Sequence, residues 1–62
     1  MSKNKESMRV AYEGVKFLRA NKINLEDTNP HIVAAYIADV EGYKLSINAL
    51  ARKIIYVWGN RK

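Results

Sequence analysis

Residues 30–59, PHIVAAYIADVEGYKLSINALARKIIYVWG, decide the fold of this chain. Pro30 suits the first turn of an α-helix, because the amide hydrogen that proline lacks would have no partner there. The residue before it, Asn29, or else Thr28, is of a type that caps helix N-termini. Gly42 is expected to end this helix, since glycine readily adopts the left-handed conformation that follows a last helical turn.

The helix predicted over residues 30–41 has two kinds of apolar position. Its large side chains recur at helical spacing and are expected to mark the buried face. They are Ile32, Val33, Tyr36, Ile37 and Val40. The small residues are expected to keep the other surfaces slim enough for close approach; they are Ala34, Ala35 and Ala38.

A second helix is predicted over residues 47–58. Ser46 is a good N-cap for it, and Gly59 is expected to stop it. The positions expected to face the core follow steps of three, four and seven. They are Ile47, Leu50, Ala51, Ile54 and Trp58, with Ile55 and Val57 extending the apolar surface.

The N-terminal part of the chain, about residues 4–22, predicts an amphipathic helix. Its apolar stripe consists of Met8, Ala11, Val15 and Leu18, widened by Val10, Tyr12 and Phe17. Gly14 lies inside this helix at a cost of about 1 kcal/mol relative to alanine. We expect Gly14 to be tolerated there rather than required by close packing. Residues 21–29 are expected to form a loop or one very short extended segment.

These elements predict an all-α, three-helix domain that spans residues 1–62 as one unit. Chains this short usually add a disulfide, a metal or a second subunit to the core. This sequence contains no Cys, and His31 is its one imidazole, so no disulfide, metal site or cofactor is predicted. We therefore expect a homodimer, with apolar residues of the first or third helix in its interface.

Charge is segregated along the chain. Residues 1–22 carry six Lys and Arg minus two acids, for +4, and residues 23–42 carry four acids, for −4. Residues 43–62 carry five cations and no acid, for +5. Such segregation is typical of an electrostatic footprint for phosphate. Alternatively, the acidic middle neutralises the basic ends within one fold or across a dimer.

Residues 30–58 resemble the helix-turn-helix of DNA-binding proteins. In that family a turn that often contains Gly joins two helices, and the second helix lies in the major groove. Ala38, four residues before Gly42, is similar to the small residue that lets those helices cross closely. The apolar residues after Gly42 stand one position off the spacing of the family's shortest turn. We therefore expect a longer connection or a different crossing.

The sequence SINAL at residues 46–50, which follows Glu41-Gly42, resembles the start of the second helix of ribbon-helix-helix repressors. This resemblance implies an alternative fold, a dimer with a short DNA-reading strand near residues 22–25. The turn over residues 42–46 is longer than is usual in that family. A whole amphipathic helix also precedes the expected strand.

The outward side of the C-terminal helix carries candidate ligands for nucleic acid. Asn48, Arg52 and Tyr56 recur in steps of four, with Lys53 beside them. Asparagine can read adenine and arginine can read guanine in the major groove, while Lys44, Lys53 and Tyr56 can reach phosphates. These five residues are the predicted binding surface. The alternative is a solvated face that happens to be basic.

Together these features predict a small DNA-binding protein, either a transcriptional regulator or an accessory factor of a viral or mobile element. The alternative is a protein-binding module, such as an inhibitor or adaptor, because the chain has many aromatic residues and Tyr and Trp are favoured interface anchors. No titratable pair converges as acid–base catalysis requires, so we expect no enzyme. No signal peptide or membrane span is predicted, which makes a cytoplasmic location the default expectation.

Overall fold

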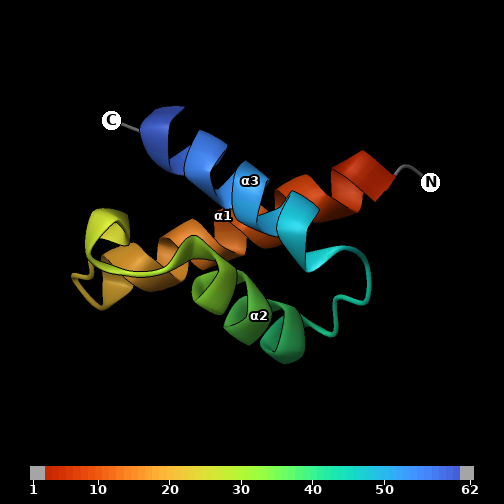
Figure 1. Cartoon of the computed structure of the whole chain (residues 1–62), viewed down its shortest axis with the longest axis horizontal. Coiled ribbons are helices and arrows are strands. Elements are labelled where there is room, and N and C mark those ends of the chain that lie inside the picture. Colours follow the sequence, from red (N-terminus) through yellow and green to blue (C-terminus); the bar gives the residue numbers. More distant parts are fainter. Residues whose placement is uncertain (1–2, 61–62) are drawn as a thin grey trace.

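The computed structural model describes the backbone of residues 3–60 and the side chains of residues 5–60. Within that range the chain forms three α-helices, one short 3-10 helix and no strand. The predicted all-α, three-helix fold is therefore confirmed. The elements are α1 (Lys3–Ala20), η1 (Leu25–Asp27), α2 (Pro30–Glu41) and α3 (Ile47–Asn60), and the three α-helices are labelled in Figure 1.

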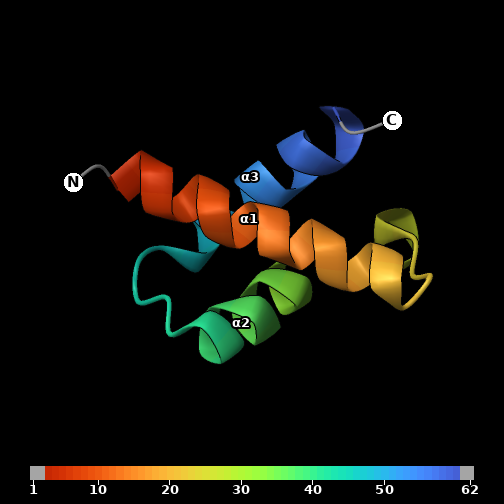
Figure 2. The ribbon, with the colours of Figure 1, turned by 180° about the vertical axis from the view of Figure 1, so that it is seen from behind.

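Helix α1 is the longest element, with 18 residues, and runs along the length of the molecule. It lies behind α2 and α3 in Figure 1 and in front of them in Figure 2. Both shorter helices pack against α1 and against each other. Helix α1 is therefore the platform that positions the other two.

Helix α1 ends two residues earlier than predicted. Lys22, expected as its last residue, has a left-handed backbone with a φ of 56°. Its amide donates to the carbonyl of Arg19 at 3.1 Å, and the amide of Ile23 donates to the carbonyl of Leu18 at 2.8 Å. These are the two bonds of a Schellman motif. Sequence rules expect glycine at such a position, but here the turn lets Ile23 pack against the core.

Residues 21–29 form a loop, as predicted, but Leu25–Asp27 within it form the short 3-10 helix η1, which was not predicted. The amide of Glu26 donates to Oδ1 of Asn24 at 3.2 Å, which caps the short helix η1. Residues 22–25, where the ribbon-helix-helix alternative expects a strand, form none in this single chain. A strand that pairs between two subunits would form only in a dimer, so that alternative stays a prediction.

The caps of α2 match the sequence prediction. Oδ1 of Asn29 accepts a hydrogen bond from the amide of His31 at 2.9 Å. At the other end Gly42 has a φ of 71°, and the amide of Tyr43 donates to the carbonyl of Ala38 at 2.8 Å. Helix α2 therefore covers residues 30–41, as expected.

Helix α3 begins where predicted and ends later. Oγ of Ser46 accepts a hydrogen bond from the amide of Ala49 at 3.2 Å, which satisfies one free donor of the first turn. The predicted stop at Gly59 is wrong, because the helix continues to Asn60. Nδ2 of Asn60 donates to the carbonyl of Tyr56 at 2.8 Å and so holds the last turn.

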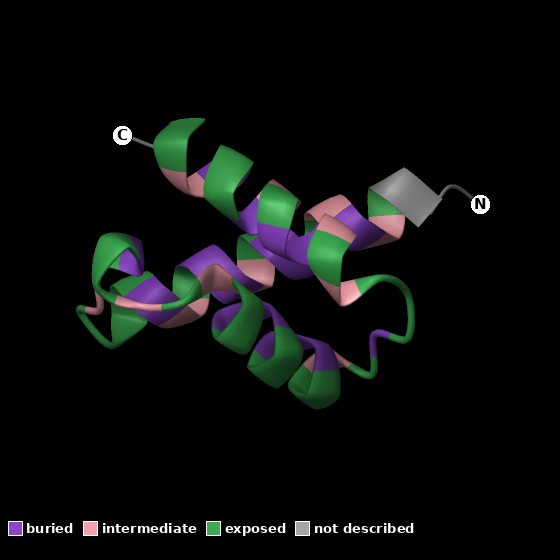
Figure 3. Ribbon diagram, in the orientation of Figure 1, coloured by how far each residue is buried: buried purple, intermediate pink, exposed green. Residues whose placement is uncertain are grey.

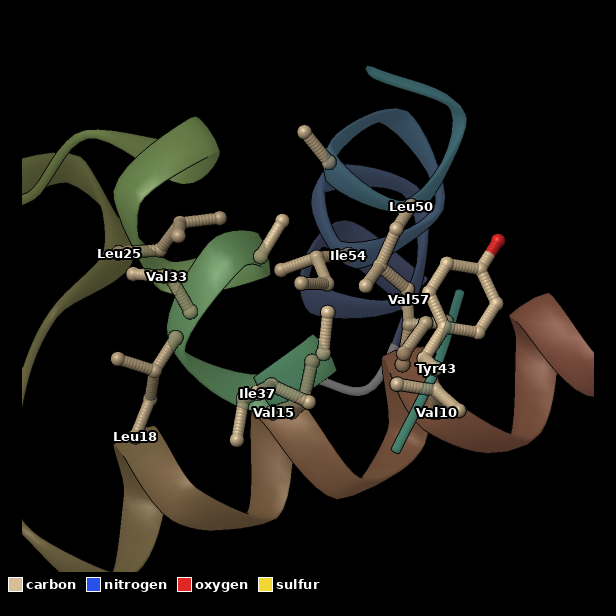
Figure 4. Packing of buried hydrophobic residues seen from close by; sticks show 14 residues of the cluster. Val10, Val15, Leu18, Leu25, Val33, Ile37, Tyr43, Leu50, Ile54 and Val57 are labelled. Carbon is tan, nitrogen blue, oxygen red and sulfur yellow. The ribbon is translucent and has the colours of Figure 1, made fainter. Parts of the chain in front are cut away.

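The core lies between the three helices. Figure 4 shows apolar side chains from all of them meeting there. Those with almost no exposed surface and the largest volume are Val10, Val15, Leu18, Leu50, Ile54 and Val57. The predicted core positions of α1 and α3 are thus largely confirmed. Met8, Phe17, Ile47 and Trp58 are only partly buried, and Tyr12 and Ile55 are exposed. The guanidinium carbon of Arg19 lies 5.2 Å from the ring centroid of Trp58.

Gly14 corrects one expectation about the core. A Cβ atom at this position would lie 3.2 Å from Cδ1 of Ile54 and 3.5 Å from Cγ1 of Ile37. These isoleucines come from α3 and α2, so Gly14 marks the place where all three helices meet. The expectation of simple tolerance is therefore wrong, because the absence of a side chain at Gly14 allows Ile54 and Ile37 to approach α1 closely.

The buried face of α2 also differs from the prediction. The residues that pack into the core are Val33, Ala34, Ile37 and Ala38. Three of the expected core positions are instead largely exposed: Ile32 at 68 %, Tyr36 at 52 % and Val40 at 58 %. Helix α2 contacts both α1 and α3, and the buried alanines leave room for these neighbours. The large side chains on the other side of α2 consequently face outward, and Figure 3 shows this exposed side in green.

Candidate nucleic-acid interface

Helix α3 is held to the rest of the molecule on one side only. Leu50, Ala51, Ile54 and Val57 are buried between α3 and its neighbours. The connection that precedes α3 is fixed by Tyr43, whose hydroxyl lies 2.7 Å from the hydroxyl of Ser7 on α1. The opposite side of α3 is exposed (Figure 3). The fold therefore leaves one long face of this helix exposed.

That outward face contains three of the five predicted ligands in one row. Asn48, Arg52 and Tyr56 are all exposed, and Tyr56 retains 61 % of its surface. Their spacing of four residues keeps them on one side of the helix. The predicted clustering of these three residues on a free face of α3 matches the structure.

The other two predicted ligands lie at the edges of this face. Lys44 is exposed in the connection before α3. Lys53 is only half-buried, and one residue step turns it about 100° from Arg52 around the helix. Lys53 therefore lies on a flank of the row, at its edge and not within it.

Ile55 is a member of this face that the sequence analysis missed. The helical pattern assigned it to an extended apolar surface, but it is 50 % exposed. At about 100° per residue it lies about 20° from Asn48 around the helix, on the side away from Arg52. Its position three residues after Arg52 is the sequence feature that indicates a place on the outward face. A large aliphatic group there would be suited to apolar contact with a thymine methyl group.

The ion pairs in residues 5–60 all involve cations of α1. Arg9 lies 3.1 Å from both Glu6 and Glu41, and Lys16 lies 3.6 Å from Glu13. Two hydrogen bonds raise the pKa of the Arg9 guanidinium above its ordinary value. The bond to Glu6 contributes most, followed by the bond to Glu41. These pairs offset much of the positive charge on this part of α1.

The cations around α3 are in a different electrostatic situation. Among the described residues, no acid lies within ion-pair distance of Lys44, Arg52 or Lys53. Helix α3 itself contains no acidic residue. The positive charge that this part of the chain carries therefore remains available for an anionic partner.

A second exposed surface lies on the other side of the molecule. A shallow groove of about 300 Å³ runs between α1 and α2, and its lining includes Phe17, Tyr36 and Val40. The rings of Phe17 and Tyr36 are 5.0 Å apart between centroids and tilted by 40°. Tyr36 and Val40 were predicted core residues, so this surface is not expected from the sequence.

Comparisons with protein-family models, curated proteins and solved structures gave no match. Residues 5–60 contain no group of three His, Asp or Glu side chains placed to hold a metal ion. Among the described helices, none has the length and apolar character that crossing a membrane requires. Functional inference therefore rests on the geometry and charge of the surfaces.

Proposed function

We propose that this protein binds duplex DNA through the outward face of α3 and acts as a small regulator of transcription or an accessory factor of a viral or mobile element. The supporting observation is the row of Asn48, Arg52 and Tyr56 on a helix without acids, whose cations form no ion pair in residues 5–60.

The size of α3 suits this role. A helix of 14 residues is about 21 Å long, and its diameter with side chains is about 10–12 Å. The major groove of B-DNA is about 12 Å wide and accepts a helix. In the proposed complex α3 lies in that groove with its buried side against α1 and α2.

Each residue of the face has a distinct proposed role. Arg52 can donate two hydrogen bonds to O6 and N7 of guanine, and Asn48 can pair with N6 and N7 of adenine. Lys44, at the end of the face, contacts a phosphate, as does Lys53 from its flank. Tyr56 donates from its hydroxyl to a phosphate oxygen.

The test measures the salt dependence of binding to duplex DNA by fluorescence anisotropy. Lys44→Ala with Arg52→Ala removes two exposed cations from the proposed face. If both residues contact phosphate, the slope of log affinity against log salt should shrink by about two units. If Arg52 reads a base instead, the slope should fall by about one unit and specific binding should weaken more than non-specific binding.

The control changes the same amount of charge elsewhere. Lys5→Ala with Lys16→Ala removes two exposed cations of α1, and it should weaken binding much less than the α3 variant. Circular dichroism of both variants checks that the fold is retained. Equal affinity of the wild-type protein and the α3 variant at low salt would remove α3 from the mechanism.

A protein-binding role is the second candidate, and one observation favours it. Ile32, Tyr36 and Val40 expose a continuous apolar surface on α2, and exposed patches of this kind mark interaction sites. Binding through this surface should depend little on salt, whereas DNA binding through α3 should depend on it steeply. A pull-down with and without nuclease, repeated at two salt concentrations, separates the two candidates.

A further inference from the structure

The outer side of α2 carries two adjacent rows of exposed residues. Steps of four place residues in one row along a helix. The first row is apolar and consists of Ile32, Tyr36 and Val40. The second row consists of His31, Ala35 and Asp39. We call these two rows together the α2 face.

Part of the α2 face continues onto α1. Tyr36 contacts Phe17, and both rings line the shallow groove between the helices. The side chains of His31 and Asp39 form no hydrogen bond or ion pair within residues 5–60. The face is thus apolar along one row and has an unused donor and acceptor at the two ends of the other.

We propose that the α2 face binds the α2 face of a second copy of this chain, with the two helices antiparallel around a two-fold axis near Ala35 and Tyr36. A two-fold contact uses the same patch on both subunits, so that patch must be complementary to itself. The two rows meet this requirement, each in its own way.

The apolar row is symmetric about its centre. Ile32 and Val40 lie four residues on either side of Tyr36. In an antiparallel pair, Ile32 of each copy therefore meets Val40 of the other, and the two Tyr36 rings meet near the axis. These are the contacts that remove the exposed apolar surface from water.

The second row supplies complementarity of charge. His31 and Asp39 lie four residues on either side of Ala35, so an antiparallel pair places the carboxylate of each Asp39 beside the imidazole of the other copy's His31. An imidazole N–H can donate to a carboxylate. A parallel pair would instead set the second row of each copy against the apolar row of the other, so neither Asp39 carboxylate would meet an imidazole.

Ala35 sits between these two ends. The distance between packed helices depends on the side chains at their contact, and a methyl group at the centre allows a close approach. Helix α2 has 12 residues and is about 18 Å long, so the contact belongs to the small size class of about 1,200 Å² or less. We therefore expect a dimer that forms in the micromolar to millimolar range.

The proposal is independent of DNA binding, because α3 contributes none of these residues. Sedimentation of the wild-type chain over that range should show monomer and dimer in exchange. Tyr36→Glu buries a carboxylate near the axis and should weaken dimerisation about tenfold or more, as expected for an aromatic anchor. The matched control, Tyr56→Glu on α3, should leave the dimer unchanged.

An exchange of charges tests the antiparallel arrangement. His31→Asp and Asp39→His each place like residues in opposition and should weaken the dimer by about twofold to fivefold, the range of exposed ion pairs. The double exchange should restore most of the wild-type affinity. Each single change suits the dipole of α2, because it places an acid near the N-terminus or an imidazole near the C-terminus. A weaker dimer would therefore not reflect a weaker helix.

Chemical cross-linking locates the axis. Because the sequence contains no Cys, Ala35→Cys introduces a single thiol, and mild oxidation should give a covalent dimer. A disulfide requires Cα atoms about 4.4–6.8 Å apart. Asn48→Cys, exposed on α3, should cross-link much less.

Three results would overturn the proposal. The first is a wild-type chain that stays monomeric into the millimolar range. The second is a Tyr56→Glu variant that loses the dimer as much as Tyr36→Glu, which would place α3 in the contact. The third is a double exchange in which the losses of dimer affinity from His31→Asp and Asp39→His simply add. That result would exclude the pairing of His31 with Asp39.

Discussion

The hydroxyl oxygens of Ser7 and Tyr43 lie 2.7 Å apart, and both side chains are buried. Ser7 is in the first turns of α1, and Tyr43 directly follows the cap of α2. This single bond ties the start of the chain to the connection that leads into α3. It is also the means by which a buried serine satisfies its hydroxyl group.

Tyr43→Phe should lower the free energy of unfolding by about 1–3 kcal/mol, because the hydroxyl of Ser7 then loses its partner in a buried site. Ser7→Ala should have a similar effect. The double variant should cost less than the sum of the two, since no unpaired group remains. Urea unfolding of the four proteins measures this coupling, and strictly additive effects would contradict it.

Gly14→Ala should stabilise the protein less than helix propensity alone suggests. The change is favourable by about 1 kcal/mol in an exposed helix, but here the new methyl group would crowd Cδ1 of Ile54 at 3.2 Å. In an Ile54→Val background that atom is absent, so the same change should be more favourable. Thermal unfolding of both pairs tests this. Equal effects of Gly14→Ala in the two backgrounds would show that the core adjusts freely.

Lys22→Gly should raise the free energy of unfolding by up to about 1 kcal/mol. The left-handed backbone of Lys22 is strained for any residue with a Cβ atom, and this strain exceeds the added entropy of glycine in the unfolded chain. Lys16→Gly, in the interior of α1, should instead lower stability by about 1 kcal/mol. A loss of stability in both variants would mean that the backbone at residue 22 is not strained.

Ser46→Ala should lower the free energy of unfolding by about 1 kcal/mol, because the amide of Ala49 loses its capping acceptor. Ser46→Asp keeps an acceptor at this position and should retain stability. If DNA binds as proposed, fraying of this first turn should also weaken binding through Asn48. Amide hydrogen exchange at residues 47–50 reports the fraying directly.

Arg52→Lys separates charge from geometry on the proposed DNA face. Lysine keeps the positive charge but lacks the planar fork that pairs with guanine. Non-specific binding and its salt slope should therefore stay close to wild type. Sequences selected from a random duplex pool should lose their preference at one guanine position. An unchanged preference would assign Arg52 to phosphate contact.

The sequence determined the number of α-helices, because the signals for them are local. Asn29 and Gly42 delimit α2 through hydrogen bonds to nearby residues of the helix, Pro30 suits its first turn, and Ser46 caps the start of α3. The outward row of α3 also followed from spacing alone. On that helix most large apolar residues fall on the side opposite the polar row, and Ile55, which is 50 % exposed, is the exception.

Only the tertiary structure decided which way α2 faces and what Gly14 does. On α2 both sides are apolar, so periodicity does not distinguish alanines that fit between two helices from larger side chains that stay outside. The contact of Gly14 with Ile54 and the bond between Ser7 and Tyr43 join residues far apart in the chain. No local pattern encodes such contacts, because they depend on how closely three helices approach one another. The exposed row of Ile32, Tyr36 and Val40 arises for the same reason. Helix α2 packs against α1 and α3 through Val33, Ala34, Ile37 and Ala38, and this contact leaves the row facing outward.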